Sequence, residues 1–546
     1  MSPWQRFLGL IELERKDVLQ VAYYAIFAGL VSLSLPLGIQ AIINLIQGAQ
    51  ITTSWILLVI LVTMGVAFAG ILQLMQMRII ETIQQRIFTR ASFEFTYRFP
   101  KMKMDELRKY YPPELANRFF DTLTVQKGLA KLLVDVPAAV LQIIFALILL
   151  AFYHPFFIVF GFLLLGLSYV VFKFTAQKGM KTSLDESKNK YKVAHWIQEV
   201  ARAVTSFKLS GKSNLSLTKN DELVSKYLEA RDSHFKILVL QFIQMIGFKV
   251  IVTAGLLTIG GALVLNQEMN IGQFVAAEII IILVINSVEK LILSLESFYD
   301  VLTSLEKLGQ VVDKDLESQN GDRPIIGENF VLELKDIQYN VPERDKSILS
   351  GIDLTIDEKT KLLIKGESGS GKSSLLRLIA GLIQPTKGSI HLNEHPFENI
   401  NLNYYRSNVG LSLSEDLPFE GTFRENIIFN DASISDNEIF SVIDSVGLRD
   451  FLKSLPKGLN TMLYPEGKQI SYTISKRIIL ARAIIKKPKL LILEDSLDQF
   501  EPNEVKAIID YLTLPSHKWA LIVVSRNERF KDVCNKTIVL KEGTII

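Results

Sequence analysis

The sequence contains a single cysteine, Cys534, among 546 residues. One thiol cannot form a disulfide within the chain, so this composition fits a protein of a reducing compartment. The charges are nearly balanced, with 60 lysines and arginines against 57 aspartates and glutamates. A net charge of +3 gives no reason to expect a nucleic-acid partner.

Charge is also missing from two long stretches, 18–77 and 136–172, which have no Asp, Glu, Lys or Arg. A helix needs about 20 apolar residues to cross a bilayer, so the first stretch has room for two crossings. Glycine, proline and polar breaks divide the chain into six expected spans, at about 18–46, 53–80, 127–153, 155–174, 237–266 and 271–296. The sequence therefore predicts an α-helical membrane domain in a lipid bilayer.

The short connections between these spans, QGAQITTS, YHP and NQEMN, have neither lysine nor arginine, whereas 78–131 and 173–236 are rich in both. Because these residues collect on the cytoplasmic side, both termini are predicted to be cytoplasmic. We expect a multi-pass protein of the plasma membrane, which in bacteria is the inner membrane. The segments 112–123 and 194–204 in the long loops are expected either to dock on a soluble domain or to extend the spans as helices.

A change of pattern after the last span divides the chain into two domains. Residues 1–312 form the predicted transmembrane domain, and the polar, glycine-containing segment 313–329 forms a linker. Residues 330–546 alternate short β-rich runs with helical ones, which indicates an α/β domain.

The segment KLLIKGESGSGKSSLLRLIAGL (361–382) places a β-run before and a helix after a glycine-rich loop. Such a loop directs backbone N–H groups at phosphate oxygens, and the following helix N-terminus adds partial positive charge. Lys372 is expected to reach the β- and γ-phosphates, and Ser373 to bind Mg²⁺. The predicted phosphate-binding residues are Gly366, Glu367, Ser368, Gly369, Ser370, Gly371, Lys372, Ser373 and Ser374.

Together with the six spans and this loop, the segments QPTKGSIHL (384–392), KRIILARAI (476–484) and KLLILED (489–495) resemble an ATP-binding cassette (ABC) half-transporter of the exporter type. SLPLGIQAIIN (33–43) is most similar to the type I secretion and peptide-exporter branch. The resemblance implies ATP and Mg²⁺ as cofactors and an α/β P-loop NTPase domain in the cytoplasm. It also implies pairing as a homodimer, or as a heterodimer with another half-transporter, and a periplasmic adaptor is a further possible partner.

In that family each ATP lies between one chain's phosphate loop and the partner's signature segment, a serine followed by two glycines. This chain keeps Ser471, which is expected to contact nucleotide, but has Tyr472 and Thr473 at the glycine positions. The switch histidine aligns with Arg526, which is permanently charged. Two further positions depart from the family. Ser414 stands where the family has a glutamine that senses Mg²⁺, and Val341 stands where it has an aromatic residue that stacks on adenine, with Tyr339 two residues away.

The catalytic acids are exchanged as well, because Glu494 precedes Asp495 where the family has aspartate and then glutamate. Glu494 remains a competent metal ligand. Asp495 is one methylene short for holding the attacking water, and the loss of a general base costs about 10² to 10⁴ in rate. An alternative register makes Asp495 and Asp498 the functional pair. The sequence predicts nucleotide binding with weak hydrolysis, and whether the domain is a working ATPase stays open.

Two charges lie within the expected spans. Reflecting the last two spans about their short connection sets Lys249 beside Val288 and Glu289, which favours an ion pair or snorkelling of the lysine over a role in transport. Glu278 lies two turns inside the last span, opposite Ile259, with no basic residue nearby. It is either a functional carboxyl facing a cavity or a protonated glutamate hydrogen-bonded to a neighbouring helix.

Two functions fit these features. The first is an exporter subunit that couples ATP binding to transport, and the second is a non-transporting membrane scaffold or regulator that senses ATP. Complete spans, long cytoplasmic loops and an intact phosphate loop favour the first, and the altered catalytic segments keep the second open. The substrate is not readable from the sequence, because the mostly apolar cavity expected here suits lipids, peptides and hydrophobic drugs alike.

Overall fold

The structure, a computed structural model, describes residues 1–47, 53–108, 110–326, 330–342 and 345–546, without the side chains of 47, 160, 163–165, 167–168 and 170–176. It divides the chain into two compact units. The first comprises residues 1–101 and 109–314, and the second comprises residues 102–108 and 315–546.

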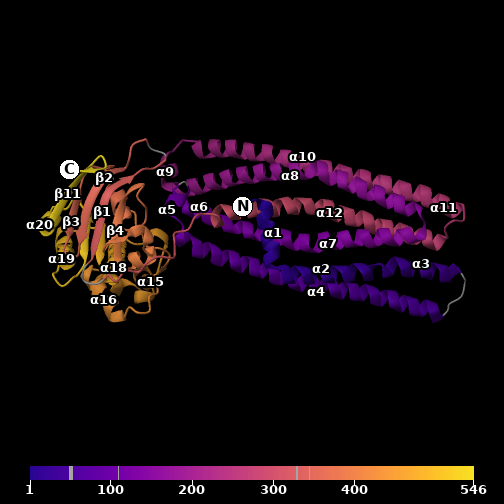
Figure 1. Cartoon of the computed structure of the whole chain (residues 1–546), viewed down its shortest axis with the longest axis horizontal. Coiled ribbons are helices and arrows are strands. Elements are labelled where there is room, and N and C mark those ends of the chain that lie inside the picture. Colours follow the sequence, from indigo (N-terminus) through magenta and orange to yellow (C-terminus); the bar gives the residue numbers. More distant parts are fainter. Residues whose placement is uncertain (48–52, 109, 327–329, 343–344) are drawn as a thin grey trace. The chain divides into compact units, whose positions relative to one another are not determined.

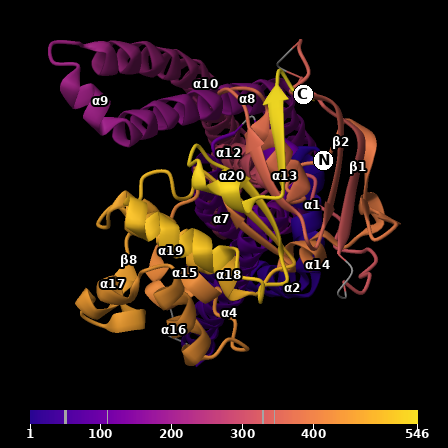
Figure 2. The ribbon, with the colours of Figure 1, turned by 90° about the vertical axis from the view of Figure 1, so that its left-hand side faces the viewer.

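The first unit is a bundle of long helices that lie alongside one another (Figure 1). Its main helices are α2 (Arg15–Ser32), α3 (Ser34–Gln47), α4 (Thr53–Arg98), α7 (Asp121–Tyr153), α8 (Phe156–Arg202), α10 (Leu215–Gly255) and α12 (Ile271–Val312). Shorter elements are α1 (Pro3–Leu13), η1 (Phe99–Lys101), α6 (Pro112–Ala116), η2 (Asn117–Phe120), α9 (Val204–Leu209), the π-helix η3 (Leu256–Gly260) and α11 (Gly261–Leu265). Figure 2 shows α9 at the tip of the hairpin formed by α8 and α10.

Among the described residues of this unit, five stretches are long and apolar enough to cross a membrane: 15–46, 53–101, 112–153, 215–265 and 271–312. The expected span at 155–174 falls in α8, where many side chains lie outside the described residues. The apolar faces pack inward, and one core joins α7, α10 and α12 around Phe248 and Val284. The predicted ion pair between α10 and α12 is confirmed, because Lys249 Nζ lies 2.6 Å from Glu289 Oε2.

The second unit contains two main sheets. The antiparallel one has the order β2-β1-β4-β5, from β1 (Val331–Tyr339), β2 (Leu349–Asp357), β4 (Lys387–Leu392) and β5 (His395–Pro396). The other has the order β12-β11-β3-β10-β9-β6, from β3 (Lys361–Lys365), β6 (Val409–Ser412), β9 (Leu490–Glu494), β10 (Ala520–Val524), β11 (Lys536–Lys541) and β12 (Thr544–Ile545). A short pair, β7 (Gly421–Thr422) and β8 (Met462–Leu463), accompanies them.

Helices surround this second sheet, whose strands β6, β9, β10, β3 and β11 run parallel. The helices of the second unit are α5 (Met104–Leu107), α13 (Lys372–Ile379), α14 (Leu402–Ser407), α15 (Phe423–Ile428), α16 (Asp436–Ser445), α17 (Arg449–Ser454), α18 (Tyr472–Ile485), α19 (Pro502–Leu512) and α20 (Arg529–Val533). Strands β9 and β10 are buried along their whole length, as expected for parallel strands covered on both faces. The structure thus has the expected helical unit and the expected α/β unit.

Candidate nucleotide-binding site and transmembrane cavity

The carboxyl ends of four parallel strands meet at one edge of the sheet in the second unit. The loop 366–371 follows β3, the loop 413–416 follows β6, Glu494 ends β9, and Ser525 follows β10. Open α/β sheets bind ligands at this edge, where strand ends and helix N-termini converge. The predicted residues from distant parts of the sequence therefore come together.

The loop 366–371 needs glycine for two physical reasons. Gly366 and Gly371 have φ of 153° and 102°, values that side-chain-bearing residues rarely adopt. A Cβ at Gly366 would lie 2.3 Å from the Leu540 carbonyl oxygen, and one at Gly371 would lie 2.8 Å from that of Ile348. The backbone is held tightly against β11 and the start of β2, which fixes the shape of the loop.

Lys372 opens α13 and lies back across the loop. Its Nζ donates to the carbonyl oxygens of Gly366 at 2.9 Å and Glu367 at 2.7 Å. The predicted residues Ser373 and Ser374 follow in the first turn of α13, and Glu367, Ser368, Gly369 and Ser370 lie within the loop. The ammonium therefore lies over the concave side of the loop, where an anion would replace the carbonyls as its partner.

Glu494 links two sides of this edge. Ser373 Oγ donates to Glu494 Oε1, and Ser414 donates to Oε2 from its Oγ at 3.2 Å and its backbone N–H at 3.4 Å. Glu494 is one methylene longer than aspartate, and Ser414 is shorter than glutamine. The two departures from the family pattern therefore compensate each other in length, and the hydrogen-bonded chain is closed.

Asp495 lies next to a second carboxylate, that of Asp498. Its φ is 46°, and its backbone N–H donates to the Val524 carbonyl at 2.8 Å. Burial, the Asp498 carboxyl and Glu494 raise the pKa of Asp495 from 3.8 to about 6, against the opposite effect of Arg526. Asp498 accepts hydrogen bonds from Ser525 Oγ at 2.6 Å and from the Arg526 backbone at 3.4 Å. Both registers considered for the acids thus have a structural counterpart: Glu494 beside Ser373, and Asp495 beside Asp498.

These contacts predict a pH dependence for any ATP hydrolysis. With a pKa of about 6, Asp495 is ionised at pH 7 and protonated at pH 5, where it cannot accept a proton from water. Phosphate release should fall as the pH decreases through about 6. Asp498→Asn removes the neighbouring negative charge and should shift the midpoint to lower pH. A steady-state pH profile of both proteins checks this, and an unmoved midpoint would contradict it.

The contribution of Asp495 to the free energy of unfolding changes with pH in the opposite direction from that of an ordinary paired carboxylate, whose pKa is lowered on folding. Because its pKa is raised on folding, the protonated form favours the folded state. This contribution is present below the unfolded pKa of 3.8 and is lost as the pH rises through about 6.

Ser471 lies at the start of the helix α18 and does not belong to the cluster at the sheet edge. Its side chain accepts from the Ile474 backbone at 3.3 Å and lies 3.0 Å from Thr473 Oγ1, as an N-cap does. In the described part of the chain no hydrogen bond joins Ser471 to the phosphate loop. Tyr472 is 41% exposed, so its ring occupies space that glycine would leave open.

The sequence analysis missed Lys476 as a structural contact. The side chain is fully buried, and its Nζ donates to the carbonyl oxygens of Leu413 at 3.2 Å, Ser414 at 2.6 Å and Asp416 at 2.8 Å. It fastens α18 to the loop that also contacts Glu494. Lysine is almost never fully buried without partners, and here three carbonyls supply them.

We predict that Lys476→Met lowers the free energy of unfolding of the nucleotide-binding domain by about 3 kcal/mol, because three buried carbonyls lose their donor. Lys468→Met is the matched control, since among the described residues that side chain forms only an exposed ion pair, with Glu466. Thermal unfolding followed by tryptophan fluorescence measures both. Equal unfolding temperatures for the two variants would contradict the assigned role.

The segment 102–108 belongs to the second unit although it lies between α4 and α6 in the chain. The Lys103 backbone donates to Asp315 at 3.1 Å, and Arg108 donates to the hydroxyl of Tyr339. The expected docking of segments 112–123 and 194–204 on the soluble domain stays a prediction. Tyr339 ends β1 and is 6% exposed, and Val341 lies beyond the strand.

A cavity of about 600 Å³ lies among α2, α4, α7 and α12 of the first unit. An adjoining hollow of about 380 Å³ shares Glu81 and Gln84 with it. Apolar atoms make up the larger part of the cavity surface, as expected, although about half of the lining residues have polar or charged side chains: Ser32, Gln73, Gln76, Glu81, Gln84, Lys131, Asp135, Gln142 and Lys290. Within the described residues, no ion pair or hydrogen bond engages the side chains of Lys131, Asp135 or Lys290.

Glu278 lies elsewhere on α12 and does not line this cavity. Its side chain is half-buried, and the described part of the chain provides it with no hydrogen-bond partner. The proposed hydrogen bond to a neighbouring helix is therefore not present there, and the functional role of this carboxyl stays a prediction.

Comparison with known proteins identifies two domains in this chain. The ABC transporter transmembrane region matches residues 21–288, and the ABC transporter domain matches residues 349–497. Similar proteins include the exotoxin translocation ATP-binding protein PaxB of Pasteurella aerogenes, 26% identical over 60% of this chain and 46% of that protein. The leukotoxin export ATP-binding protein LtxB of Aggregatibacter actinomycetemcomitans is 26% identical over 57% of this chain and 45% of its own length.

Among solved structures, a bacterial Atm1-family ABC exporter with ATP bound is similar to this chain, with a TM-score of 0.85 and 16% sequence identity. That likeness covers 98% of this chain and 95% of the other and establishes the exporter fold. The chain spans less than half the length of the curated relatives PaxB and LtxB. Two matching domains in the family order, on this fold, establish that the chain is a multi-pass membrane protein of the ABC transporter family.

Proposed function

We propose that this chain is a half-transporter subunit of an exporter that couples ATP binding to transport and hydrolyses ATP slowly. The observation that carries the proposal is the closed hydrogen-bonded chain from Ser373 through Glu494 to Ser414, beneath a phosphate loop of intact shape. It preserves the link between the phosphate loop and the neighbouring loop despite the changed residues. Slow hydrolysis follows from Asp495, which is short and shares its surroundings with another carboxylate.

The residues present fit Mg–ATP. The Ser373 hydroxyl and the Glu494 carboxylate are oxygen donors already in contact, and Mg²⁺ prefers such ligands with water completing its shell. When bound, the metal neutralises phosphate charge. Lys372 would bind the phosphates, and the glycine loop would donate its backbone N–H groups.

We propose that two chains act together in the membrane, in bacteria the inner one, as a homodimer or with a second half-transporter. Ser471 at the start of α18 would then face the phosphate loop of the other chain. Each composite site would contain an altered acid from one chain or an altered signature from the other. This arrangement supports binding-driven rather than hydrolysis-driven cycling.

The experiment uses a single spin label per chain at the tip of the α8–α10 hairpin. Cys534→Ser removes the native thiol, Ser206→Cys on the exposed α9 takes the label, and the reconstituted protein is measured by double electron–electron resonance. An exporter homodimer should show a defined distance between the two labels that shifts when Mg–ATP is added. A distance that does not change with nucleotide would favour the non-transporting scaffold, and the absence of any defined distance between labels would exclude the homodimer.

We also propose that the transported molecule is polar and bears charge, such as an extended peptide. Side-chain amides offer a donor and an acceptor each, which matches a peptide backbone. Charges within membrane helices are costly unless they face a cavity or a ligand, and Lys131, Asp135 and Lys290 do line this cavity. A lipid tail would leave all three without a partner.

Removing two opposite charges tests this specificity. Lys290→Met with Asp135→Asn should weaken the stabilisation of the protein by short zwitterionic peptides about tenfold in apparent affinity. Lys127→Met on α7, which does not line the cavity, is the matched control. Thermal shift against peptide and phospholipid titrations measures both. Equal peptide responses in all variants, or a response to phospholipid alone, would contradict the proposed substrate class.

A further inference from the structure

The loop 413–416, which follows β6, is held at Ser414 by two different partners. Ser414 donates to Glu494 Oε2 from its Oγ at 3.2 Å and from its backbone N–H at 3.4 Å. Its carbonyl oxygen accepts a hydrogen bond from Lys476 Nζ at 2.6 Å. The orientation of Ser414 toward the carboxylate therefore depends on the ammonium that holds its carbonyl.

The ammonium of Lys476 is fully engaged by this loop. Besides Ser414, the carbonyl oxygens of Leu413 and Asp416 accept from Nζ at 3.2 and 2.8 Å. An ammonium has three N–H donors, so these three carbonyls use all of them. Burial lowers the pKa of Lys476, while neighbouring carboxylates, including that of Glu494, act in the opposite direction. Lys476 thus has no donor left for a phosphate, and its influence on the site passes through the loop.

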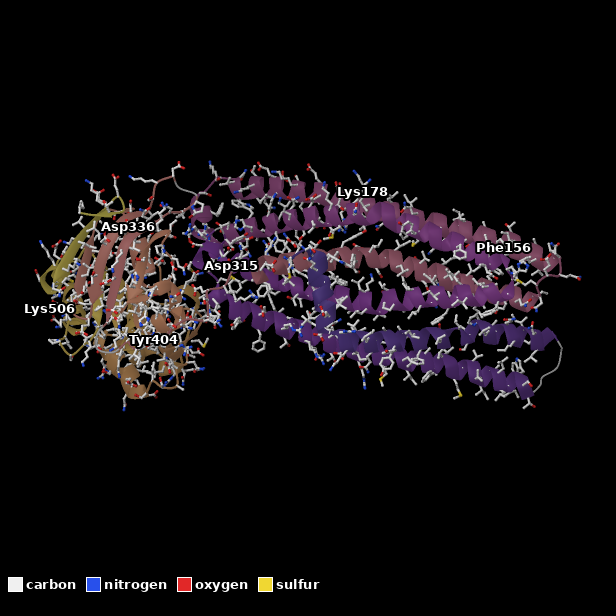
Figure 3. The ribbon with its side chains drawn as sticks, in the orientation of Figure 1. Phe156, Lys178, Asp315, Asp336, Tyr404 and Lys506 are labelled. Atoms are coloured by element: carbon white, nitrogen blue, oxygen red, sulfur yellow. The ribbon has the colours of Figure 1, made fainter. Side chains whose placement is uncertain are left out.

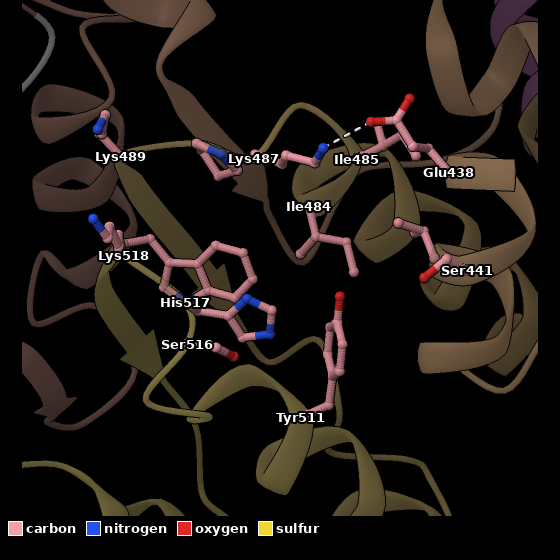
Figure 4. Close-up of a pocket in the computed structure, with 13 residues that line it drawn as sticks. Glu438, Ser441, Ile484, Ile485, Lys487, Lys489, Tyr511, Ser516, His517 and Lys518 are labelled. Carbon is pink, nitrogen blue, oxygen red and sulfur yellow. Dashed lines mark hydrogen bonds and ion pairs between the residues drawn. The ribbon is translucent and has the colours of Figure 1, made fainter. Parts of the chain in front are cut away.

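The helix that carries Lys476 is itself firmly held. The buried side chains of α18 and β9 belong to one hydrophobic core. Just beyond the far end of α18, Lys487 pairs with Glu438 on α16 at 2.7 Å (Figure 4). Lys476 therefore fastens the loop 413–416 to the same core that positions β9, the strand that ends at Glu494.

The start of α18 supplies a further contact to the ammonium. Tyr472 lies one turn before Lys476, so the two side chains are on the same face of the helix. The centroid of the Tyr472 ring lies 5.3 Å from Lys476 Nζ, within the range of a cation–π interaction. Tyr472 is 41% exposed, so part of its ring remains accessible from outside. A glycine at this position would leave the ammonium without that cover.

We propose that Lys476 is a positioning residue for the Mg²⁺ ligand Glu494, and that the ring of Tyr472 holds its ammonium in place. This role rests on the Mg–ATP site proposed above. Lys476 acts through Ser414, whose hydroxyl and N–H engage Glu494 Oε2. The other oxygen, Oε1, then stays directed at Ser373, the second proposed metal ligand. Residues that orient a metal ligand in this way typically contribute about 10- to 100-fold to metal affinity.

The test compares two ATP affinities of the full-length protein, one measured with Mg²⁺ and one with EDTA, by isothermal titration calorimetry. Their ratio isolates the contribution of the metal, because partial unfolding of a variant weakens both affinities by the same factor. Lys476→Gln should lower this ratio about tenfold or more. Lys476→Arg keeps the charge and the donors and should keep a larger ratio than Lys476→Gln. Lys506→Gln, at an exposed position on α19 (Figure 3), is the matched control and should leave the ratio unchanged.

A change at Tyr472 tests the same role without removing a buried donor. Tyr472→Leu should lower the ratio about two- to fivefold, whereas Tyr472→Phe keeps the ring and should not lower it. Added to Lys476→Gln, Tyr472→Leu should have no further effect, because both act through one ammonium.

Three outcomes would contradict the proposal in different ways. Equal ratios in the wild type, Lys476→Gln and Tyr472→Leu would overturn the positioning role while leaving the Mg–ATP site in place. A loss from Tyr472→Leu that is undiminished beside Lys476→Gln would overturn the part assigned to the ring. A wild-type protein that binds ATP equally with Mg²⁺ and with EDTA would overturn the proposed metal site, and this role with it.

Discussion

Lys372→Ala should lower the affinity for Mg–ATP by about 100-fold, since each charge-assisted hydrogen bond to phosphate contributes about 1.5 to 3 kcal/mol. In the structure the Lys372 ammonium rests on the carbonyls of Gly366 and Glu367, at 2.9 and 2.7 Å. Phosphate oxygens would replace these two neutral acceptors with charged ones. The loop itself does not depend on the lysine side chain, because Gly366 and Gly371 set its shape through their backbone conformation.

Isothermal titration with Mg–ATP measures the effect, and Lys359→Ala is the control. Lys359 is exposed at the turn before β3, at the opposite end of the strand from the loop, so its removal should leave the affinity unchanged. Equal affinities for the wild type and Lys372→Ala, or no detectable binding to either, would remove the basis for a nucleotide-driven function.

The phosphate loop was predictable because its parts are close in the sequence. A β-run, a glycine-rich turn and an amphipathic helix within 361–382 determine the local geometry, and the structure has β3, the loop and α13 in that order. The ion pair between Lys249 and Glu289 was predictable for a similar reason, because a short connection between two antiparallel helices fixes which residues face each other.

Contacts between distant segments were not predictable in the same way. Lys476 looks like one more charged residue on a helix, and only the fold shows that it is buried against carbonyls about 60 residues earlier in the chain. The match between the longer Glu494 and the shorter Ser414 requires knowing that β6 lies beside β9. The cavity with its polar and charged lining residues is assembled from four helices, so no single stretch of sequence indicates it.

The second large effect concerns repair of the hydrolytic machinery. Glu494→Asp with Asp495→Glu restores the family's order of acids, but we expect less than about a tenfold rise in phosphate release from it. The structure supplies a specific reason. Glu494 Oε2 reaches Ser414 at 3.2 Å, and an aspartate one methylene shorter would lose that contact while Ser414 stays short. The exchange therefore removes the hydrogen bond between residues 414 and 494, although it gives position 495 the longer acid.

The signature and switch positions limit the exchanged pair further. Tyr472 keeps a partly exposed ring at the start of α18, where backbone would approach the partner's nucleotide in the proposed dimer, and Arg526 cannot act as a neutral acceptor. Residues that act as one catalytic unit are not additive, so repairing one member regains little while another is absent. Adding Tyr472→Gly, Thr473→Gly and Arg526→His should therefore give a much larger rise than the exchange alone.

Phosphate release from the reconstituted protein compares the wild type, the exchanged pair and the five-site variant under saturating Mg–ATP. Ser414→Gln added to the five-site variant tests the length argument directly, because the longer amide restores the reach to the shortened carboxylate at the end of β9 and should raise the rate again. Ser414→Gln in the wild type should instead lower the rate of phosphate release. Glu494 already reaches Ser414 there, so the longer glutamine side chain would clash with Glu494. A large recovery from the exchange alone would show that Tyr472, Thr473 and Arg526 limit hydrolysis less than their side chains suggest.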